Sequence, residues 1–258
     1  MTLNDWPAGG SPQIAGPQIK SHLGSNLHHR IHVLAVALTY KDFAPDDEPL
    51  IGPVEDVRYL EDFLSDYEYV YFQTLFESDA TRDNIIRHFQ AGLTQCQPTT
   101  LFVIYLAGHG ENTPQHGYSF TTYYERSEER QNAMLNFQDL LQGIRTDVQI
   151  FQIRDTCDSS PNPRERYLLE NKHVIVLSAS GTNQPAYEAS AASPHSFLLR
   201  RMERAVRSSG FNTSTDIRVS VAQFFNILMD PIEHVNDESP FVQNPQLLPE
   251  RSLSKVTY

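Results

Sequence analysis

The sequence predicts an α/β domain built on a largely parallel sheet with helices on both faces. Short apolar segments typical of strands alternate with segments whose apolar residues recur at helical spacing. Most strand-like segments are continuously apolar, as expected when both faces of a strand are buried. Alternation of strands and helices favours parallel pairing, because each crossover connection then contains a helix.

The predicted elements follow one another along most of the chain. Residues 54–64 place Val54, Val57, Leu60, Phe63 and Leu64 on one helical face. Thr81 is a suitable N-cap for the helix that follows it. In chain order we predict a strand at 32–40, a helix at 54–64, a strand at 68–76, a helix at 81–93, a strand within 100–110 that runs into a glycine turn, a hairpin arm at 117–124, a short helix at 136–144, strands at 148–155 and 173–180, helices at 195–206 and 219–229, and an irregular tail from Pro231.

Composition limits the function classes. The 258 residues are 40% hydrophobic and 10% aromatic, which is enough for a substantial core in one large or two small domains. The formal net charge of −12 argues against a general nucleic-acid binder and allows basic substrates. No apolar run approaches the length of a membrane span. We therefore expect neither nucleic acid nor a membrane among the partners.

Cysteine content and the N-terminal sequence bear on location. Cys96 and Cys157 are the only cysteines and do not make a disulfide framework, which favours a reducing compartment. The opening residues lack both the basic start and the apolar segment of a secretory signal. We expect a cytoplasmic protein.

The chain is expected to contain one main domain between a leader and a tail. The leader is rich in Gly, Pro, Ser and Gln and has no sustained periodicity. The linker contains two prolines and several charged residues and is expected to be exposed. The predicted parts are a flexible leader at 1–30, a domain at 31–250 with a first part at 31–160, a linker at 158–172 and a second part at 173–250, and a tail at 251–258.

Two strand ends carry the residues best suited to chemistry. One delivers His109 between two glycines, and the other delivers Cys157 two residues after Asp155. In open α/β sheets ligands bind outside the carboxyl ends of the strands, and a Cys beside a His can form a nucleophile–base pair. Either residue alone is more often structural, but their joint placement at strand ends favours catalysis.

Other candidates are weaker. His116 is a rival base in an expected loop, and Cys96 lies near a helix end as a bystander. The histidines of segment 28–32 have no set of Cys or carboxylate residues to complete a metal site, so no metal or other cofactor is predicted.

Several segments resemble one known family. LFVIYLAGHG (101–110) is similar to a strand ending in Ser-Gly-His-Gly, and FQIRDTCDSS (151–160) to one ending in Asp-x-Cys-His-Ser-Gly. The chain thus resembles the caspase-like cysteine peptidases (clan CD, peptidase C14), and metacaspases and paracaspases more than animal caspases. The His-to-Cys spacing, 157 − 109 = 48 residues, is close to the caspase interval of about 50. Other similar segments are GPVEDVRYLEDFL (52–64), VIVLSASGTNQPAYE (174–188), HSFLLRRMERAV (195–206) and NPQ (244–246).

The resemblance implies a fold and a reaction. The fold is caspase-like, with a mostly parallel central six-stranded sheet flanked by helices on both faces. The reaction is peptide hydrolysis by an endopeptidase, in which Cys157 attacks, His109 acts as base and an acyl-enzyme forms. The N–H groups of Gly110 and Cys157 would form the oxyanion hole. Regulated cell death or immune defence is the expected setting, with a regulatory protein as an expected partner.

The resemblance also implies a substrate preference. Asp155 and Asp56 match metacaspase residues that line the pocket for a basic substrate side chain, so a protein or peptide substrate cut after Arg or Lys is expected. For Asp56, a helix-start carboxylate favoured by the helix dipole is an equally good interpretation. Strand alternation should place Asp155 and Cys157 on one side and Arg154 on the other.

If cleavage follows basic residues, the enzyme is expected to cut its own linker. Arg164 and Arg166 are the candidate sites, in a proline-containing stretch.

The chain departs from the family pattern at three motif positions. Ala107 stands where metacaspases usually have Ser, Asp158 where His follows the Cys, and Ser160 where Gly is usual. Asp158 is expected to be a solvated loop charge. The departures favour an alternative, a catalytically weak homologue acting as a binding or scaffold module, and a third reading is an unrelated α/β binding domain. The acidic cluster that binds calcium in many metacaspases has no clear counterpart, so calcium activation is not supported.

Overall fold

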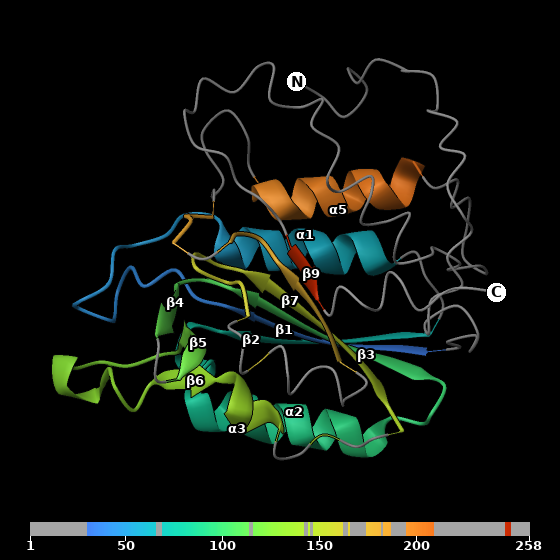
Figure 1. Ribbon diagram of the computed structural model, residues 1–258, viewed down its shortest axis with the longest axis horizontal. Helices are drawn as coiled ribbons and strands as arrows, with labels where there is room; N and C mark the ends of the chain where they lie inside the picture. The colour runs from blue at the N-terminus through green and yellow to red at the C-terminus, as the bar shows by residue number, and fades with distance from the viewer. Residues whose placement is uncertain are drawn as a thin grey trace.

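A computed structural model of the chain confirms the predicted α/β class (Figure 1). It describes residues 30–65, 69–113, 116–141, 144, 147–161, 165, 174–181, 183–186, 195–208 and 246–248.

A six-stranded sheet forms the centre of the molecule, in the order β2-β1-β3-β7-β8-β9. Neighbouring strands are parallel except for β9, which runs antiparallel to β8. The strands are β1 (Arg30–Ala37), β2 (Val70–Phe76), β3 (Thr100–Ala107), β7 (Gln149–Asp155), β8 (Val174–Ser178) and β9 (Gln246–Leu248). The prediction of an irregular tail is wrong at β9, because a three-residue strand within a Pro- and Asn-rich segment gives no periodic signal.

Helices cover both faces of this sheet (Figure 1). α1 (Pro53–Ser65) and α5 (Phe197–Ser208) lie on one face, and α2 (Arg82–Gln95) and α3 (Phe137–Leu141) on the other. Thr81 caps α2 as predicted, because its side chain accepts a hydrogen bond from the N–H of Asn84. The predicted helix at 219–229 lies outside the described residues.

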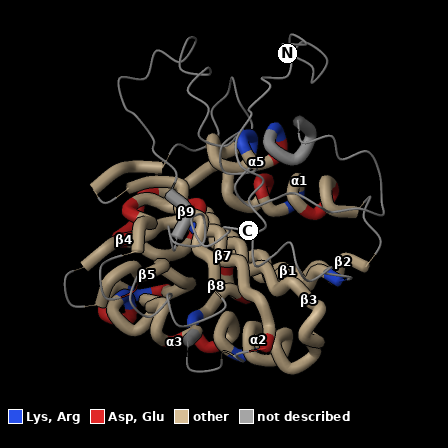
Figure 2. The backbone as a smooth tube through the Cα atoms, turned by 45° about the vertical axis from the view of Figure 1, so that its right-hand side comes forward, with Lys and Arg blue, Asp and Glu red and all other residues tan. Residues whose placement is uncertain are grey.

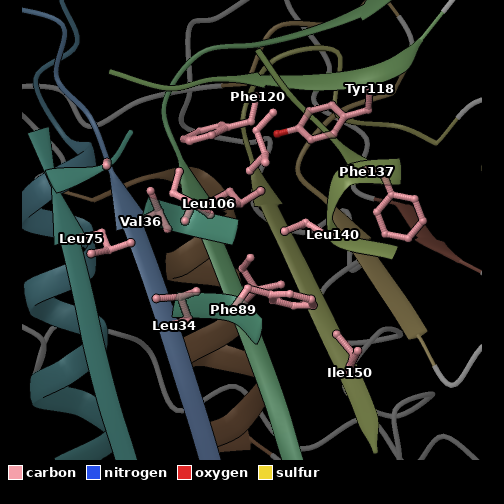
Figure 3. Packing of buried hydrophobic residues seen from close by; sticks show 14 of the residues in the cluster. Leu34, Val36, Leu75, Phe89, Leu106, Tyr118, Phe120, Phe137, Leu140 and Ile150 are labelled. Atoms are coloured by element: carbon pink, nitrogen blue, oxygen red, sulfur yellow. The ribbon is translucent and has the colours of Figure 1, made fainter. Parts of the chain in front are cut away.

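Alternate residues of β1 face opposite layers, as the pleat requires. Leu34 and Val36 enter an apolar cluster that includes Phe89 of α2 (Figure 3). Val33 enters a second cluster on the other face, which includes Val57 of α1. Burial on both faces explains why the strand is continuously apolar in sequence.

The two helices on one face differ in charge (Figure 2). α5 carries Arg200, Arg201 and Arg204, whereas α1 carries Glu55, Asp56, Glu61 and Asp62 beside a single Arg. Although α5 also carries Glu203, the two helices have net charges of opposite sign.

A small antiparallel sheet stands beside the carboxyl ends of the central strands. It contains β4 (Gly110–Thr113), β5 (Gly117–Thr121) and β6 (Met134–Asn136). β5 is the predicted hairpin arm. β4 and β6 escaped prediction because they are short and lack a period-2 pattern.

The predicted linker is not wholly exposed. Ser159, Ser160 and Glu165 are each at most 2% exposed, so the expectation of an exposed stretch is wrong at these residues. The reason is tertiary, because the carboxylate of Glu165 pairs with a guanidinium that is itself buried.

Candidate active site

Two neighbouring strands bring His109 and Cys157 to the same edge of the sheet. β3 pairs in parallel with β7, and the last matched pair is Ala107 with Asp155. His109 lies two residues after the end of β3, and Cys157 lies two residues after the end of β7. Both residues are partly exposed. Strand register thus places the two residues on neighbouring strand ends, as the hypothesis of a nucleophile–base pair requires.

Close backbone packing joins the two strand ends. A Cβ atom built on Gly110 would lie 2.5 Å from Thr156 Oγ1 and 2.9 Å from the carbonyl oxygen of Cys157. Any side chain at Gly110 would therefore displace the segment that carries Cys157. The two residues predicted to form an oxyanion hole are thus in direct proximity.

The imidazole of His109 is oriented by the chain before α1. Its Nε2 lies 2.6 Å from the carbonyl oxygen of Glu48. A carbonyl can only accept, so Nε2 carries the proton and Nδ1 keeps its lone pair in the neutral ring. Nδ1 is therefore the atom available as a base.

Tyr40 fixes His109 from a second direction. The two rings lie 4.6 Å apart, and the N–H of His109 donates to the Tyr40 hydroxyl at 3.0 Å. That hydroxyl donates in turn to the carbonyl of Thr121 at 2.6 Å. Gly108 has a φ of +156°, and a Cβ there would lie 2.6 Å from the Tyr40 oxygen. The glycine before the histidine is thus required for this contact.

The thiol of Cys157 receives a main-chain hydrogen bond. The N–H of Ala186 lies 3.3 Å from Sγ. A hydrogen bond donated to sulfur stabilises the thiolate over the neutral thiol. Because the donor is a main-chain group, this hydrogen bond cannot be predicted from the residue types in the sequence.

The two predicted pocket carboxylates meet at one serine. Ser196 donates its N–H to Asp56 Oδ1 at 3.0 Å and its hydroxyl to Asp155 Oδ2. Tyr105 also donates to Asp155 Oδ2, at 2.7 Å. Burial raises the pKa of Tyr105 well above its usual range, and the charges of Asp155 and Asp56 add to that effect. Both acids are nearly buried, at 8% and 3% exposure, so their charges act in a poorly screened environment.

Sequence reasoning missed the roles of Ser196 and His195. Ser196 caps α5, since its Oγ accepts the N–H of Leu199 at 3.1 Å, and a serine before a helical pattern is the signal that could have found it. His195 stacks on Tyr59 with ring centroids 4.1 Å apart, and its Nδ1 lies 3.2 Å from Asp56 Oδ1. Burial lowers the pKa of His195.

Arg154 points away from Asp155, as strand alternation predicted. It is fully buried and lies over the ring of Tyr118, 4.1 Å from the centroid. It forms an ion pair with Glu165 at 3.2 Å and donates to the carbonyl of Ser159 at 3.1 Å. The strand before Cys157 therefore anchors both the loop that carries Cys157 and part of the linker.

Asp158 is a partly exposed loop residue, as expected, and in addition it makes specific hydrogen bonds. Its carboxylate accepts the N–H of Asn183, and its own N–H donates to the carbonyl of Gln184 at 3.0 Å. The contacts are to main-chain groups remote in sequence, which explains why composition gave no hint of them.

The weaker candidates lie in other parts of the fold. His116 is exposed in a turn, with its N–H bound to Thr113, and Cys96 is the buried C-cap of α2. Arg164 and Arg166 lie outside the described residues. Within the described part of the chain, no three His, Cys, Asp or Glu side chains gather to hold a metal ion. In the same part, every helix is too short or too polar to cross a bilayer.

The chain matches one known protein family. The profile of the caspase domain matches residues 32–249, which is most of the chain. The chain belongs to the caspase-domain family. Members of this family are cysteine peptidases, and the region matched contains both His109 and Cys157. A search of curated proteins found no match.

Solved structures show the same fold as this caspase domain. Caspase-1 from Spodoptera frugiperda superimposes with a TM-score of 0.60 at 10% identity, covering 86% of this chain and 87% of that one. A structural-genomics target protein from Geobacter sulfurreducens superimposes with a TM-score of 0.59 at 14% identity, covering 84% and 92%. At such identities the likeness concerns the fold, and confirms the predicted caspase-like architecture.

Proposed function

We propose that this caspase domain is a cysteine endopeptidase that cleaves proteins after Arg or Lys. The observation that carries the proposal is the register of β3 and β7, which brings His109 and Cys157 to one edge within a domain of a peptidase family. The specificity rests on a separate observation, the paired carboxylates of Asp155 and Asp56.

The reaction begins with proton transfer from Cys157 to Nδ1 of His109, the nitrogen that the Glu48 carbonyl leaves free. The thiolate then adds to the peptide carbonyl, and the N–H groups of Gly110 and Cys157 stabilise the oxyanion. Collapse breaks the C–N bond as His109 returns the proton to the leaving amine. Water, deprotonated by His109, hydrolyses the thioester and regenerates the thiol.

A basic substrate side chain fits the electrostatics beside this nucleophile. Asp155 precedes Cys157 by two residues, and Asp56 shares Ser196 with it. Two nearly buried carboxylates repel a substrate Asp and attract a guanidinium, which can bind a carboxylate through two hydrogen bonds.

Nucleophile and base are tested by substitution. Cys157→Ala and His109→Ala should each abolish hydrolysis of a fluorogenic Arg peptide, while circular dichroism and the unfolding midpoint stay near those of the parent protein. His116→Ala, at an exposed turn, is the matched control and should keep full activity. Turnover that survives in Cys157→Ala would rule the assignment out.

Specificity is tested with peptides that differ only in the residue before the cut. Arg and Lys peptides should be cleaved and an Asp peptide should not. Losing one partner of a desolvated charge pair costs about 2–5 kcal/mol, so Asp155→Ala and Asp155→Asn should each lower kcat/KM for the Arg peptide by more than about tenfold. Glu61→Gln, on the exposed face of α1, is the control. Efficient cleavage after Asp would overturn the pocket assignment.

An arginyl reagent with a thiol-reactive group distinguishes an enzyme from a scaffold. Stoichiometric labelling of Cys157 supports the peptidase. An unlabelled Cys157 in folded protein would favour the alternative, a binding or scaffold module. The departures from the family pattern at Asp158 and Ser160 are the features that suggested this alternative.

A further inference from the structure

We propose that Asp158 is a positioning residue for Cys157: it clamps the loop 183–186 so that the N–H of Ala186 points at the sulfur. The inference rests on the proposed function only in taking Cys157 as the nucleophile. Asp158 stands directly after Cys157, where the resemblance leads one to expect His.

The clamp has two parts, and both use main-chain groups of the loop. The carboxylate Oδ1 of Asp158 accepts the N–H of Asn183. The N–H of Asp158 donates to the carbonyl of Gln184 at 3.0 Å. Asp158 and Asn183 both have positive φ angles, of 48° and 58°, a conformation that Asp and Asn adopt more readily than most residues. Residue type and backbone shape therefore agree at both ends of the contact.

Two further hydrogen bonds join Gln184 to Gly181, so the clamp restrains more than one residue. The N–H of Gly181 donates to Gln184 Oε1 at 2.9 Å, and the N–H of Gln184 donates to the carbonyl of Gly181 at 3.2 Å. Ala186 follows two residues after Gln184 and gives its N–H to Sγ of Cys157 at 3.3 Å. Holding Gln184 thus sets where the Ala186 N–H lies.

The negative charge of Asp158 and its hydrogen bonds to the loop 183–186 affect the thiolate of Cys157 in opposite directions. Experiment can therefore separate the two effects. Titratable groups near Cys157 within the described part of the chain include His109 after β3, Tyr118 of β5, and Asp155 and Asp158 on either side in sequence. As a bare charge, Asp158 disfavours the thiolate; through the clamp it favours the thiolate, because a donated N–H stabilises the anion.

The experiment compares Asp158→Ala with Asp158→Asn, which removes the charge and keeps an acceptor oxygen. The rate of carboxamidomethylation of Cys157 by iodoacetamide is followed against pH, by mass spectrometry of the Cys157 peptide. The clamp predicts that Asp158→Ala raises the apparent pKa of the Cys157 thiol and lowers kcat/KM for the Arg peptide by about tenfold or more. Asp158→Asn should stay within about threefold of the parent, since it retains the hydrogen bond to Asn183.

A bare-charge role gives the opposite result. Both variants would then lower the pKa of the Cys157 thiol equally, and this outcome overturns the proposal. Ala186→Pro removes the donated N–H directly and should reproduce the effect of Asp158→Ala on the thiol; an unchanged alkylation profile in that variant also overturns it. Alkylation needs no turnover, so a protein that cleaves no peptide but shows the Ala-versus-Asn difference refutes the peptidase and leaves the clamp standing.

Discussion

At the scale of single residues, Tyr40 connects the backbone of His109 to the small sheet. Its hydroxyl accepts the N–H of His109 and donates to the carbonyl of Thr121. Tyr40→Phe leaves both groups without this partner, at a cost of about 1–3 kcal/mol in the free energy of unfolding, and we expect kcat to fall because His109 loses a constraint. Urea denaturation and peptide kinetics measure the two effects. Tyr71→Phe is the control, since Tyr71 is 54% exposed.

His32 is expected to make the stability of the fold depend on pH. It is 6% exposed, lies between Tyr71 and Phe102, and its Nε2 finds no hydrogen-bond partner among the described residues. Burial lowers its pKa, so between the folded pKa and the unfolded value of about 6.5 the unfolded chain binds the extra proton. Stability from this group is complete above about pH 6.5 and is lost as the pH falls toward the folded pKa.

His32→Leu should therefore flatten the dependence of the unfolding free energy on pH between about 7 and 5. Urea midpoints across this range measure it. Some dependence on pH should remain in this variant, because burial also lowers the pKa of His195. His116→Gln, at an exposed position, is the control. An unaltered slope in His32→Leu would contradict this account of its burial.

At the scale of elements, one ion pair ties β7 to the linker. Arg154 and Glu165 are 0% and 1% exposed, and the pair lies between Tyr118 and the loop that carries Cys157. Removing one member of a buried pair leaves an uncompensated charge, at a cost of about 3–5 kcal/mol. We expect Glu165→Ala to lose this much stability by urea denaturation. Glu55→Ala breaks the half-exposed pair with Arg58 and should cost about 1 kcal/mol or less.

The double variant Arg154→Met with Glu165→Leu gives the matching control for this pair. Replacing a buried pair by apolar residues of similar volume is often neutral, so the double variant should be more stable than Glu165→Ala. If the double variant is no more stable than Glu165→Ala, the lost hydrogen bond from Arg154 to Ser159 offsets the gain from removing the unpaired charge.

At the scale of the whole molecule, the sheet would hold the two parts of the chain together if the linker were cut. β8 follows the linker in sequence yet pairs with β7 from Ile150–Val174 to Arg154–Ser178. If the protein cleaves after basic residues, incubation of active protein should yield new termini after Arg164 or Arg166, detected by mass spectrometry. Because β7 and β8 pair, the two fragments should then co-elute on gel filtration. Cys157→Ala should stay intact. A fully active, uncut chain would show that cleavage is not required.

The buried Glu165 lies between these two sites, so it should slow their cleavage. Glu165→Gln weakens the anchor, and added trypsin should then cut at Arg164 or Arg166 faster than in the parent protein. Equal rates would mean that the anchor does not protect the linker.

The sequence alone predicted the class of fold, and it singled out two candidate catalytic residues. Continuous apolar runs such as 101–107 identify strands buried on both faces, and helical periodicity identified α1 and α2, because both signals are local. His109 and Cys157 followed from the same signals, as polar residues at the ends of such strands. Parallel pairing places both residues at the same edge of the sheet, and the observed strand order makes β3 and β7 neighbours.

Tertiary structure decided the contacts that complete the site. Ser196 reaches Asp155 across 41 residues of chain and Asp56 across 140, and Ala186 reaches Cys157 across 29. Two of these three bonds are donated by main-chain N–H groups, which every residue but proline has, so residue type carries no information about them. Such contacts depend on where loops and helix ends come to rest after packing, and only the folded chain fixes that.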